Sequence, residues 1–247
     1  VKKSFGTLAT PLHHIFDLSL SQGIFPDSLK VAKVTPIYKK DDPTELGNYR
    51  PISVLPCFSK VLERIMYNRL YKHLKENSIL YNKQFGFQKA HSTEHAILEL
   101  IDKLLTRFEQ NEFTLGVFID LSKAFDTVDH SILLRKLEIY GVKGKNLSWF
   151  QSYLSNRKQC VSISSNEHTS FLKITCGVPQ GSILGPLLFI LYINDLKNVS
   201  KLIDPIMFAD DTNLFTSHKD VRTLINITNN ELKKLNDWFT ANKLSLN

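Results

Sequence analysis

The sequence has few cysteines and no long uninterrupted apolar run, and each shortage excludes a class of protein. Cys57, Cys160 and Cys176 are scattered, without a Cys-x-x-Cys spacing. This argues against a disulfide framework or a zinc knuckle and is typical of a reducing compartment. The longest apolar run, residues 183–193, is interrupted by a glycine and a proline and would span about 16 Å as a helix. That is too short to cross a bilayer, so we expect no membrane partner.

Glycine-rich phosphate-binding loops are also missing, as are low-complexity tracts and internal repeats. Hydrophobic residues make up 43% of the 247 residues and charged residues 22%, which excludes intrinsic disorder and fibrous structure. A chain of this length predicts one large unit or two interlocked ones. Because it begins without methionine at Val1, we interpret it as an excised part of a longer protein.

The charge balance is basic, with 31 Lys and Arg against 24 Asp and Glu, a net charge of +7 and an isoelectric point near 9.2. This suits a polyanionic partner without proving one. No acidic residue occurs between Glu138 and Glu167. From charge alone, a solvated face is the commoner explanation of such a run. The basic residues in it are Lys143, Lys145, Arg157 and Lys158.

The spacing of apolar residues predicts most of the secondary structure. Four prolines between residues 1 and 48 predict an irregular start. Ser92 or Thr93 is a candidate N-cap. Helices are predicted over 58–74, 93–108, 130–140, 146–154, 182–195 and 221–239, and strands over 114–120, 159–163, 171–174, 206–208 and 213–216. The order predicts an α+β fold, an antiparallel sheet with helices on one face.

Two adjacent carboxylates, Asp210 and Asp211, lie in a turn between two short apolar strands. Aspartates are common in turns for purely local reasons, which is the structural alternative. Two rigidly held carboxylates repel each other unless a cation is present, and Mg²⁺ with oxygen ligands is the natural partner.

Asp120 ends another apolar strand and is the candidate third carboxylate, although it could also cap the following turn. If that strand lies beside the hairpin, all three carboxylates meet at one edge. Three carboxylates can bridge two metal ions about 3.5–4 Å apart, the arrangement used for in-line phosphoryl transfer.

Several longer motifs carry a resemblance to a known family. They are Phe-Ile-Asp-Leu-Ser-Lys-Ala-Phe-Asp at 118–126, Gly-Val-Pro-Gln-Gly-Ser-Ile-Leu-Gly-Pro at 177–186 and Phe-Ala-Asp-Asp at 208–211, with Gln-Phe-Gly-Phe at 84–87 and Asn-Lys-Leu-Ser-Leu-Asn at 242–247. Taken in their order along the chain, these motifs resemble those of the reverse transcriptases of non-LTR retrotransposons, the long interspersed, jockey-like elements.

This resemblance implies that Asp120, Asp210 and Asp211 bind two Mg²⁺ ions, with Mn²⁺ as a substitute. The carbonyl of Leu121 is implied as a further metal ligand. Phe125 matches an aromatic steric gate that excludes the ribose 2′-hydroxyl; core packing is its alternative explanation.

The resemblance also implies a pocket for the incoming nucleotide. Gln180 and Gly181 match a loop lining the nucleotide and template, where glycine allows close backbone approach. Lys39 and Arg50 match cations that hold the triphosphate, and Lys40 remains open as a substitute for Lys39. In this setting the basic run at Lys143, Lys145, Arg157 and Lys158 is better explained by phosphate contacts.

By resemblance, the fold is a right-hand polymerase without its thumb. Residues 1–113 and 130–176 are assigned to mostly helical fingers, and residues 114–129 and 177–247 to the palm. The implied function is RNA-directed DNA synthesis by two-metal phosphoryl transfer, in the family during target-primed retrotransposition. The partners are an RNA template, a DNA primer and deoxynucleoside triphosphates; protein partners stay unknown, and the nucleus and cytoplasm are expected from the family. The alternatives are an inactive nucleic-acid-binding relict and an RNA-dependent RNA polymerase.

Overall fold

The computed structural model describes residues 5–162 and 168–247, and its chain divides into two compact units. The first comprises Val1–Leu70 and His130–Gly185, and the second Tyr71–Asp129 and Pro186–Asn247. The chain therefore passes from one unit to the other three times. Residues 71–113, expected with the fingers, belong to the second unit, and residues 177–185, expected with the palm, belong to the first.

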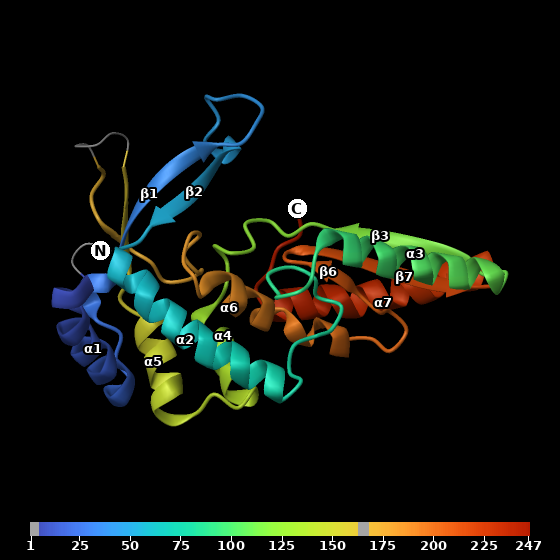
Figure 1. Ribbon diagram of the computed structural model, residues 1–247. Helices are drawn as coiled ribbons and strands as arrows, with labels where there is room; N and C mark the ends of the chain where they lie inside the picture. Colours follow the sequence, from blue (N-terminus) through green and yellow to red (C-terminus); the bar gives the residue numbers. More distant parts are fainter. Residues whose placement is uncertain (1–4, 163–167) are drawn as a thin grey trace. The chain divides into compact units, whose positions relative to one another are not determined.

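The first unit combines helices with a mixed sheet of strand order β2-β1-β4-β5. Figure 1 labels β1 and β2 of this sheet and the helices α1, α4 and α5. β1 pairs antiparallel with β2 and parallel with β4. The strands are β1 (Val31–Tyr38), β2 (Tyr49–Val54), β4 (Lys158–Val161) and β5 (Leu172–Lys173), and the helices are α1 (Phe5–Gln22), α4 (His130–Ile139), α5 (Gly144–Leu154) and the larger part of α2 (Cys57–Glu76).

The prediction of an irregular start is wrong, because α1 and β1 lie there. α1 forms despite Pro11 in its interior because it packs on α5: the indole of Trp149 donates to Ser19 Oγ at 3.0 Å. Such tertiary contacts override the low helix propensity of proline. β1 tolerates Pro36 because it lies opposite Pro51, in a non-hydrogen-bonded pair where neither strand needs an amide.

The second unit is built on an antiparallel sheet of order β3-β7-β6. Its strands are β3 (Phe113–Ile119), β6 (Ile206–Phe208) and β7 (Asp211–His218), and its helices are α3 (Thr93–Glu109), α7 (Val221–Ala241) and most of α6 (Gly185–Tyr192), which is followed by a 3₁₀ turn, Asn194–Asn198. As predicted, the apolar α6 is buried, although it is shorter than expected.

Helices lie on both faces of this sheet, so the expectation of one covered face is wrong. Along β7, Thr216 faces α7 and its hydroxyl lies 2.6 Å from that of Thr228. The alternate residues Asn213 and Phe215 instead line a cavity together with Ile97 of α3. Side chains alternate between faces along a strand, so α7 and α3 cover opposite faces (Figure 1).

The other predicted helices and strands are present, with ends shifted by a few residues. The predicted hairpin at 159–163 and 171–174 forms as β4 and β5, with Ile163 outside the described residues. Within the described ranges, no helix is both long and apolar enough to span a bilayer.

Candidate active site

Asp120 and Asp211 come to the same end of the sheet in the second unit. Asp120 directly follows Ile119, the last residue of β3, and Ile119 is paired with Thr212. Asp211 is the first residue of β7 and directly precedes Thr212. The register therefore makes the two aspartates neighbours across adjacent strands. Both are exposed, and both line one cavity of about 370 Å³ beneath α3.

Asp210 lies in the tight turn from β6 to β7. The turn begins at Ala209, a buried residue with φ of 57°, in the left-handed region. For a residue with a Cβ this conformation costs roughly 1–2 kcal/mol, so the surrounding structure must hold it. Asp210 is half-buried, whereas Asp211 is exposed.

The donor set at this sheet end suits a hard cation. The candidate ligands are carboxylate oxygens and one backbone carbonyl, the ligands that Mg²⁺ prefers. In the parts of the chain that are described, however, no three His, Cys, Asp or Glu side chains gather closely enough to form a finished metal cluster. The residues therefore fit the metal in type, and Asp120 and Asp211 share one end of the sheet.

The sequence analysis missed Asn247 as a partner of Asp120. Its side-chain amide donates to Asp120 Oδ2 at 2.8 Å, and its backbone N–H donates to the Asp120 carbonyl at 2.9 Å. These bonds continue a short antiparallel bridge in which Leu121 faces Leu246. The bridge uses the Asp120 carbonyl and the Ser122 amide, so the backbone groups of Leu121 point away from it. The motif at 242–247 resembles that of the family, but the motif alone indicates no role for Asn247.

Phe125, the candidate steric gate, is half-buried in an aromatic stack. Its ring lies on that of the fully buried Phe189, with centroids 4.6 Å apart, and meets the edge of Phe87 at 5.9 Å. The ring is therefore rigidly oriented, while part of its surface stays accessible.

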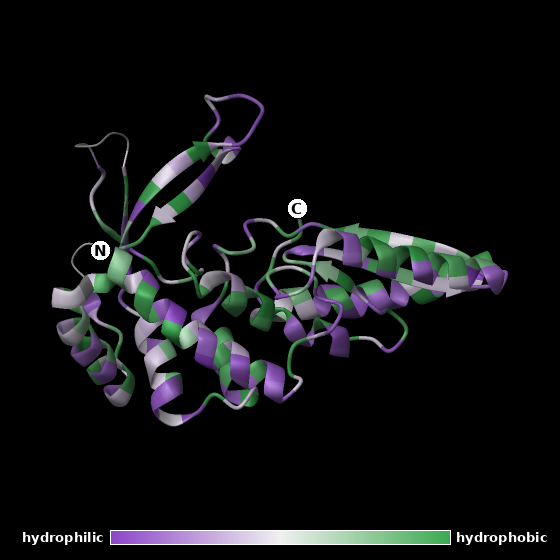
Figure 2. Cartoon of the chain, in the orientation of Figure 1, coloured by the Kyte–Doolittle hydropathy of each residue, from purple (hydrophilic) through white to green (hydrophobic). Residues whose placement is uncertain are grey.

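Lys39 and Arg50 lie on the β1–β2 hairpin of the first unit. Arg50 pairs with Ile37, and the Lys39 amide extends the ladder to the Asn48 carbonyl at 2.8 Å. Side chains two residues apart along a strand share a face, and Lys39 lies two residues beyond Ile37, the partner of Arg50. Lys39 and Arg50 are therefore diagonal neighbours on one face, with Cα atoms about 7–8 Å apart. Both are exposed, and Figure 2 shows the hairpin tip as hydrophilic. Lys40 is also exposed and lies 3.8 Å from the carboxylate of Asp41, so Lys39 and Lys40 both stay candidates for the phosphate contact.

The Gln180–Gly181 loop docks on the same hairpin. The Gln180 carbonyl accepts the Ser53 amide at 2.7 Å. Gly181 has φ of +115°, and a Cβ there would lie 2.6 Å from the Ser53 carbonyl oxygen and 3.8 Å from Ile52 Cγ2. Only glycine permits this approach. Ile52 shares its face with Arg50, so the Gln180–Gly181 loop contacts β2 two to three residues along the strand from Arg50.

Glu63 is a further residue that the sequence analysis missed. Its fully buried carboxylate accepts the backbone N–H groups of Ile183 and Leu184 at 2.7 and 3.2 Å, and the hydroxyl of Ser59 at 2.9 Å. It thereby satisfies backbone donors at the start of α6 and holds the end of the Gln180–Gly181 loop.

The basic run does not form one cluster. Lys143 and Lys145 are exposed at the start of α5, and Lys158 is exposed beyond its far end, a helix length of about 16 Å away. Arg157 is fully buried, with its guanidinium 4.9 Å from the ring centre of Tyr153 and Nη1 donating to the Tyr153 carbonyl at 3.1 Å. The prediction of a phosphate contact is wrong for Arg157, because its charge is enclosed by aromatic packing. Burial also raises the pKa of Tyr153.

Comparison with known proteins decides the family. Residues 37–247 match the family described as reverse transcriptase (RNA-dependent DNA polymerase). The chain belongs to this family. It is 36% identical over 217 residues to a probable RNA-directed DNA polymerase from transposon BS of Drosophila melanogaster, covering 82% of this chain and 23% of that protein.

Other reverse transcriptase relatives agree with this. The RNA-directed DNA polymerase from mobile element jockey of Drosophila melanogaster is 32% identical over 221 residues, covering 84% of this chain and 23% of that protein. The predicted resemblance to polymerases of non-LTR elements is thus confirmed. The chain spans about a quarter of the length of these relatives.

Solved telomerase structures share the fold of this reverse transcriptase chain. Apo telomerase from Candida tropicalis superposes with a TM-score of 0.61 at 15% identity, over 98% of this chain and 48% of that one. Telomerase from Candida albicans gives 0.58 at 16% identity, over 85% and 42%.

Proposed function

We propose that this chain is the polymerase core of an RNA-directed DNA polymerase that adds deoxynucleotides to a primer 3′-hydroxyl on an RNA template. The observation that carries the proposal is the meeting of Asp120 and Asp211 at one sheet end, beside the turn that bears Asp210. Within a retrotransposon protein, the primer is a nicked target DNA and the template is the element's RNA.

Two Mg²⁺ ions, or Mn²⁺ in their place, would be held by Asp120, Asp210, Asp211 and the Leu121 carbonyl. When bound, such ions activate the attacking hydroxyl and neutralise charge on the phosphates. In this proposal the chain contributes oxygen ligands from four residues, which lie at or next to one end of the sheet.

The remaining residues bind and select the nucleotide. Lys39 and Arg50 hold the triphosphate from one face of the hairpin, and arginine suits a bidentate phosphate contact. The backbone of Gln180 and Gly181 contacts the incoming nucleotide. Phe125 fills the space that a 2′-hydroxyl needs, which favours deoxynucleotides over ribonucleotides and argues against an RNA polymerase.

The test is primer extension on an RNA template by the full-length protein carrying Asp210→Asn. We expect synthesis to be lost while RNA binding is retained, because the substitution removes a metal-binding charge and preserves shape. Asp237→Asn, which changes an exposed carboxylate on α7, is the matched control and should leave synthesis unchanged. An Asp210→Asn protein that still extends primers would refute the proposal. A wild-type protein that binds RNA but neither Mn²⁺ nor nucleotide would instead identify an inactive relict.

A further inference from the structure

A short segment of the second unit, residues 81–86, runs along the outer edge of β6. Gln84 forms a parallel bridge with Met207. The Phe85 amide donates to the Met207 carbonyl at 2.7 Å, and the Met207 amide donates to the Lys83 carbonyl at 2.9 Å. The segment is therefore a short added strand on the side of the sheet that leads into the Asp210–Asp211 turn.

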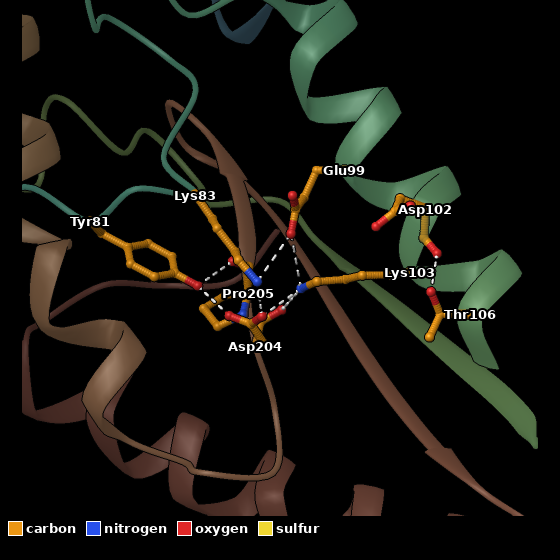
Figure 3. Close-up of polar contacts among 8 residues, drawn as sticks. All are labelled: Tyr81, Lys83, Glu99, Asp102, Lys103, Thr106, Asp204 and Pro205. Carbon is orange, nitrogen blue, oxygen red and sulfur yellow. Dashed lines mark hydrogen bonds and ion pairs between the residues drawn. The ribbon is translucent and has the colours of Figure 1, made fainter. Parts of the chain in front are cut away.

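Its beginning is anchored by a polar cluster around Asp204 (Figure 3). The Tyr81 hydroxyl lies 2.6 Å from Asp204 Oδ1 and 2.8 Å from the Pro205 carbonyl. The ammonium groups of Lys83 and Lys103 both contact Asp204 Oδ2. These contacts fix the segment and the start of β6 in one register.

Its other end holds the turn itself through the side chain of Gln84. The amide nitrogen Nε2 donates to the Ala209 carbonyl at 3.1 Å, and Oε1 accepts the Ala209 N–H at 2.9 Å. Oε1 also accepts the Gly86 N–H at 2.8 Å. Gln84 is 2% exposed, so water does not compete for these bonds.

This arrangement meets a specific need of Ala209. Ala209 is in the two-residue turn beyond the last β6–β7 pair, Phe208 with Asp211, so its N–H and carbonyl take no part in the ladder and, being buried, need other partners. A primary amide offers one donor side and one acceptor side, as a peptide group does, and satisfies both. Gly86 completes the fit, because a Cβ on it would lie 2.2 Å from the Ala209 nitrogen.

We propose that Gln84, supported by Gly86, is a positioning residue that holds Ala209 in its left-handed conformation and so sets the direction of the Asp210 and Asp211 carboxylates. The inference rests on the proposed polymerase function. Gln84 touches neither metal nor substrate in this role and acts through the backbone of the turn.

The test compares Gln84→Leu with a matched control, Asn194→Leu, in the full-length protein. Asn194 is also a buried primary amide that binds backbone groups in this unit. It accepts the Tyr81 N–H at 2.8 Å and donates to the Ile79 carbonyl at 2.9 Å, so it holds the beginning of the segment but makes no bond to the turn. Gln84→Leu loses three buried bonds to backbone groups and Asn194→Leu loses two, so a general loss of stability should be of comparable size in the two.

The readouts are Mn²⁺ binding by electron paramagnetic resonance, and hydrogen exchange of a peptide spanning residues 206–212 without metal. We expect Gln84→Leu to weaken Mn²⁺ binding about 10–100-fold, the usual effect of losing a partner behind metal ligands. Exchange in the turn should be faster than in Asn194→Leu. Gly86→Ala, which displaces the turn by contact and keeps the Gln84 amide, should weaken Mn²⁺ binding in the same direction.

Asp210→Asn separates the possible failures. If Asp210→Asn weakens Mn²⁺ binding but Gln84→Leu changes it no more than Asn194→Leu does, the positioning role is refuted and the polymerase proposal stands. If Asp210→Asn leaves Mn²⁺ binding unchanged, the metal site of the proposed function is refuted. Unaltered Mn²⁺ binding in a folded Gly86→Ala protein would also contradict the positioning role.

Discussion

Glu63 and Arg157 are charged residues that the fold of the first unit encloses completely. Glu63 accepts three hydrogen bonds and orders the start of α6. Arg157 donates one, to the Tyr153 carbonyl, while its Nε and Nη2 atoms have no hydrogen-bond partner among the described residues. Its charge is balanced in part by the face of the Tyr153 ring. Neither role follows from residue type, since buried and exposed charges look the same in a sequence.

Phe125 allows a prediction about sugar selection at the residue scale. In the full-length enzyme, Phe125→Ala should raise the efficiency of ribonucleotide incorporation relative to deoxynucleotide incorporation, because it removes a steric block. One face of Phe125 is held by Phe189, so the ring cannot simply swing aside. The ratio of kcat/KM values for paired nucleotides measures this. Phe87→Ala, which removes the neighbouring ring and keeps Phe125, is the control. A ratio equal to that of the wild type would leave Phe125 as a packing residue.

Among the elements, α3 differs from the other long helices because none of its residues is buried. Its apolar stripe is largely exposed; Leu105 and Phe108 are 57% and 79% accessible. The helix is attached to the unit partly through ion pairs, in which Lys103 lies 2.6 Å from Asp204 and Glu99 lies 3.1 Å from Lys83 (Figure 3). A helix held in this way depends on charge as well as on packing.

This attachment predicts a pH dependence of stability. Burial alone would raise the pKa of Asp204, but hydrogen bonds from Lys103, Lys83 and Tyr81 outweigh it and lower the pKa from 3.8 to about 2. A carboxyl group whose pKa is lower in the folded state stabilises that state at pH values above its pKa in the unfolded chain. This stabilisation is lost as the pH falls through the pKa of the folded state. Asp204→Asn should therefore lower the free energy of unfolding by about 1 kcal/mol at neutral pH, since the half-exposed side chain is partly screened by solvent.

The difference between wild type and Asp204→Asn should shrink between about pH 4 and pH 2. Urea unfolding across this pH range measures it. Asp102→Asn, an exposed carboxylate on the same helix, is the control and should show no comparable effect. A difference that stays constant down to pH 2 would contradict the role assigned to the Asp204 ion pairs.

For the whole molecule, the net charge of +7 bears on nucleic-acid binding. If exposed Lys143, Lys145 and Lys158 each contact a phosphate, RNA binding releases counterions and weakens as salt rises. Three contacts to a single strand give a logarithmic salt slope of about −2, a loss of about 15-fold in affinity from 50 to 200 mM salt.

Substituting these three lysines by glutamine in the full-length protein should reduce the magnitude of its salt slope by about 2, whatever other contacts it makes. Fluorescence anisotropy with a labelled RNA, across a salt series, measures the slope. Lys233→Gln, on the exposed side of α7, is the control. A slope that the triple substitution leaves unchanged would mean that these residues form an ordinary solvated surface.

The sequence by itself determined the features that depend on neighbouring residues. Helical periodicity located α2, α3, α5 and α7 to within a few residues, and Ser92 caps α3 as its type and position predict. The Phe-Ala-Asp-Asp and Pro-Gln-Gly motifs by themselves indicate the reverse transcriptase family. These features are readable because helix and turn geometry repeats over a few residues.

Only the tertiary structure decided features that depend on residues far apart in the chain. The bonds from Gln84 to Ala209 join positions 125 residues apart, and the burial of Arg157 depends on how the surrounding elements pack. Packing against α5 also decided that α1 forms around Pro11. Which side chains of β7 face α7 and which face α3 is likewise decided by the positions of these two helices on the sheet. Local patterns do not encode these contacts, because their free energy arises when distant segments exclude water from one another.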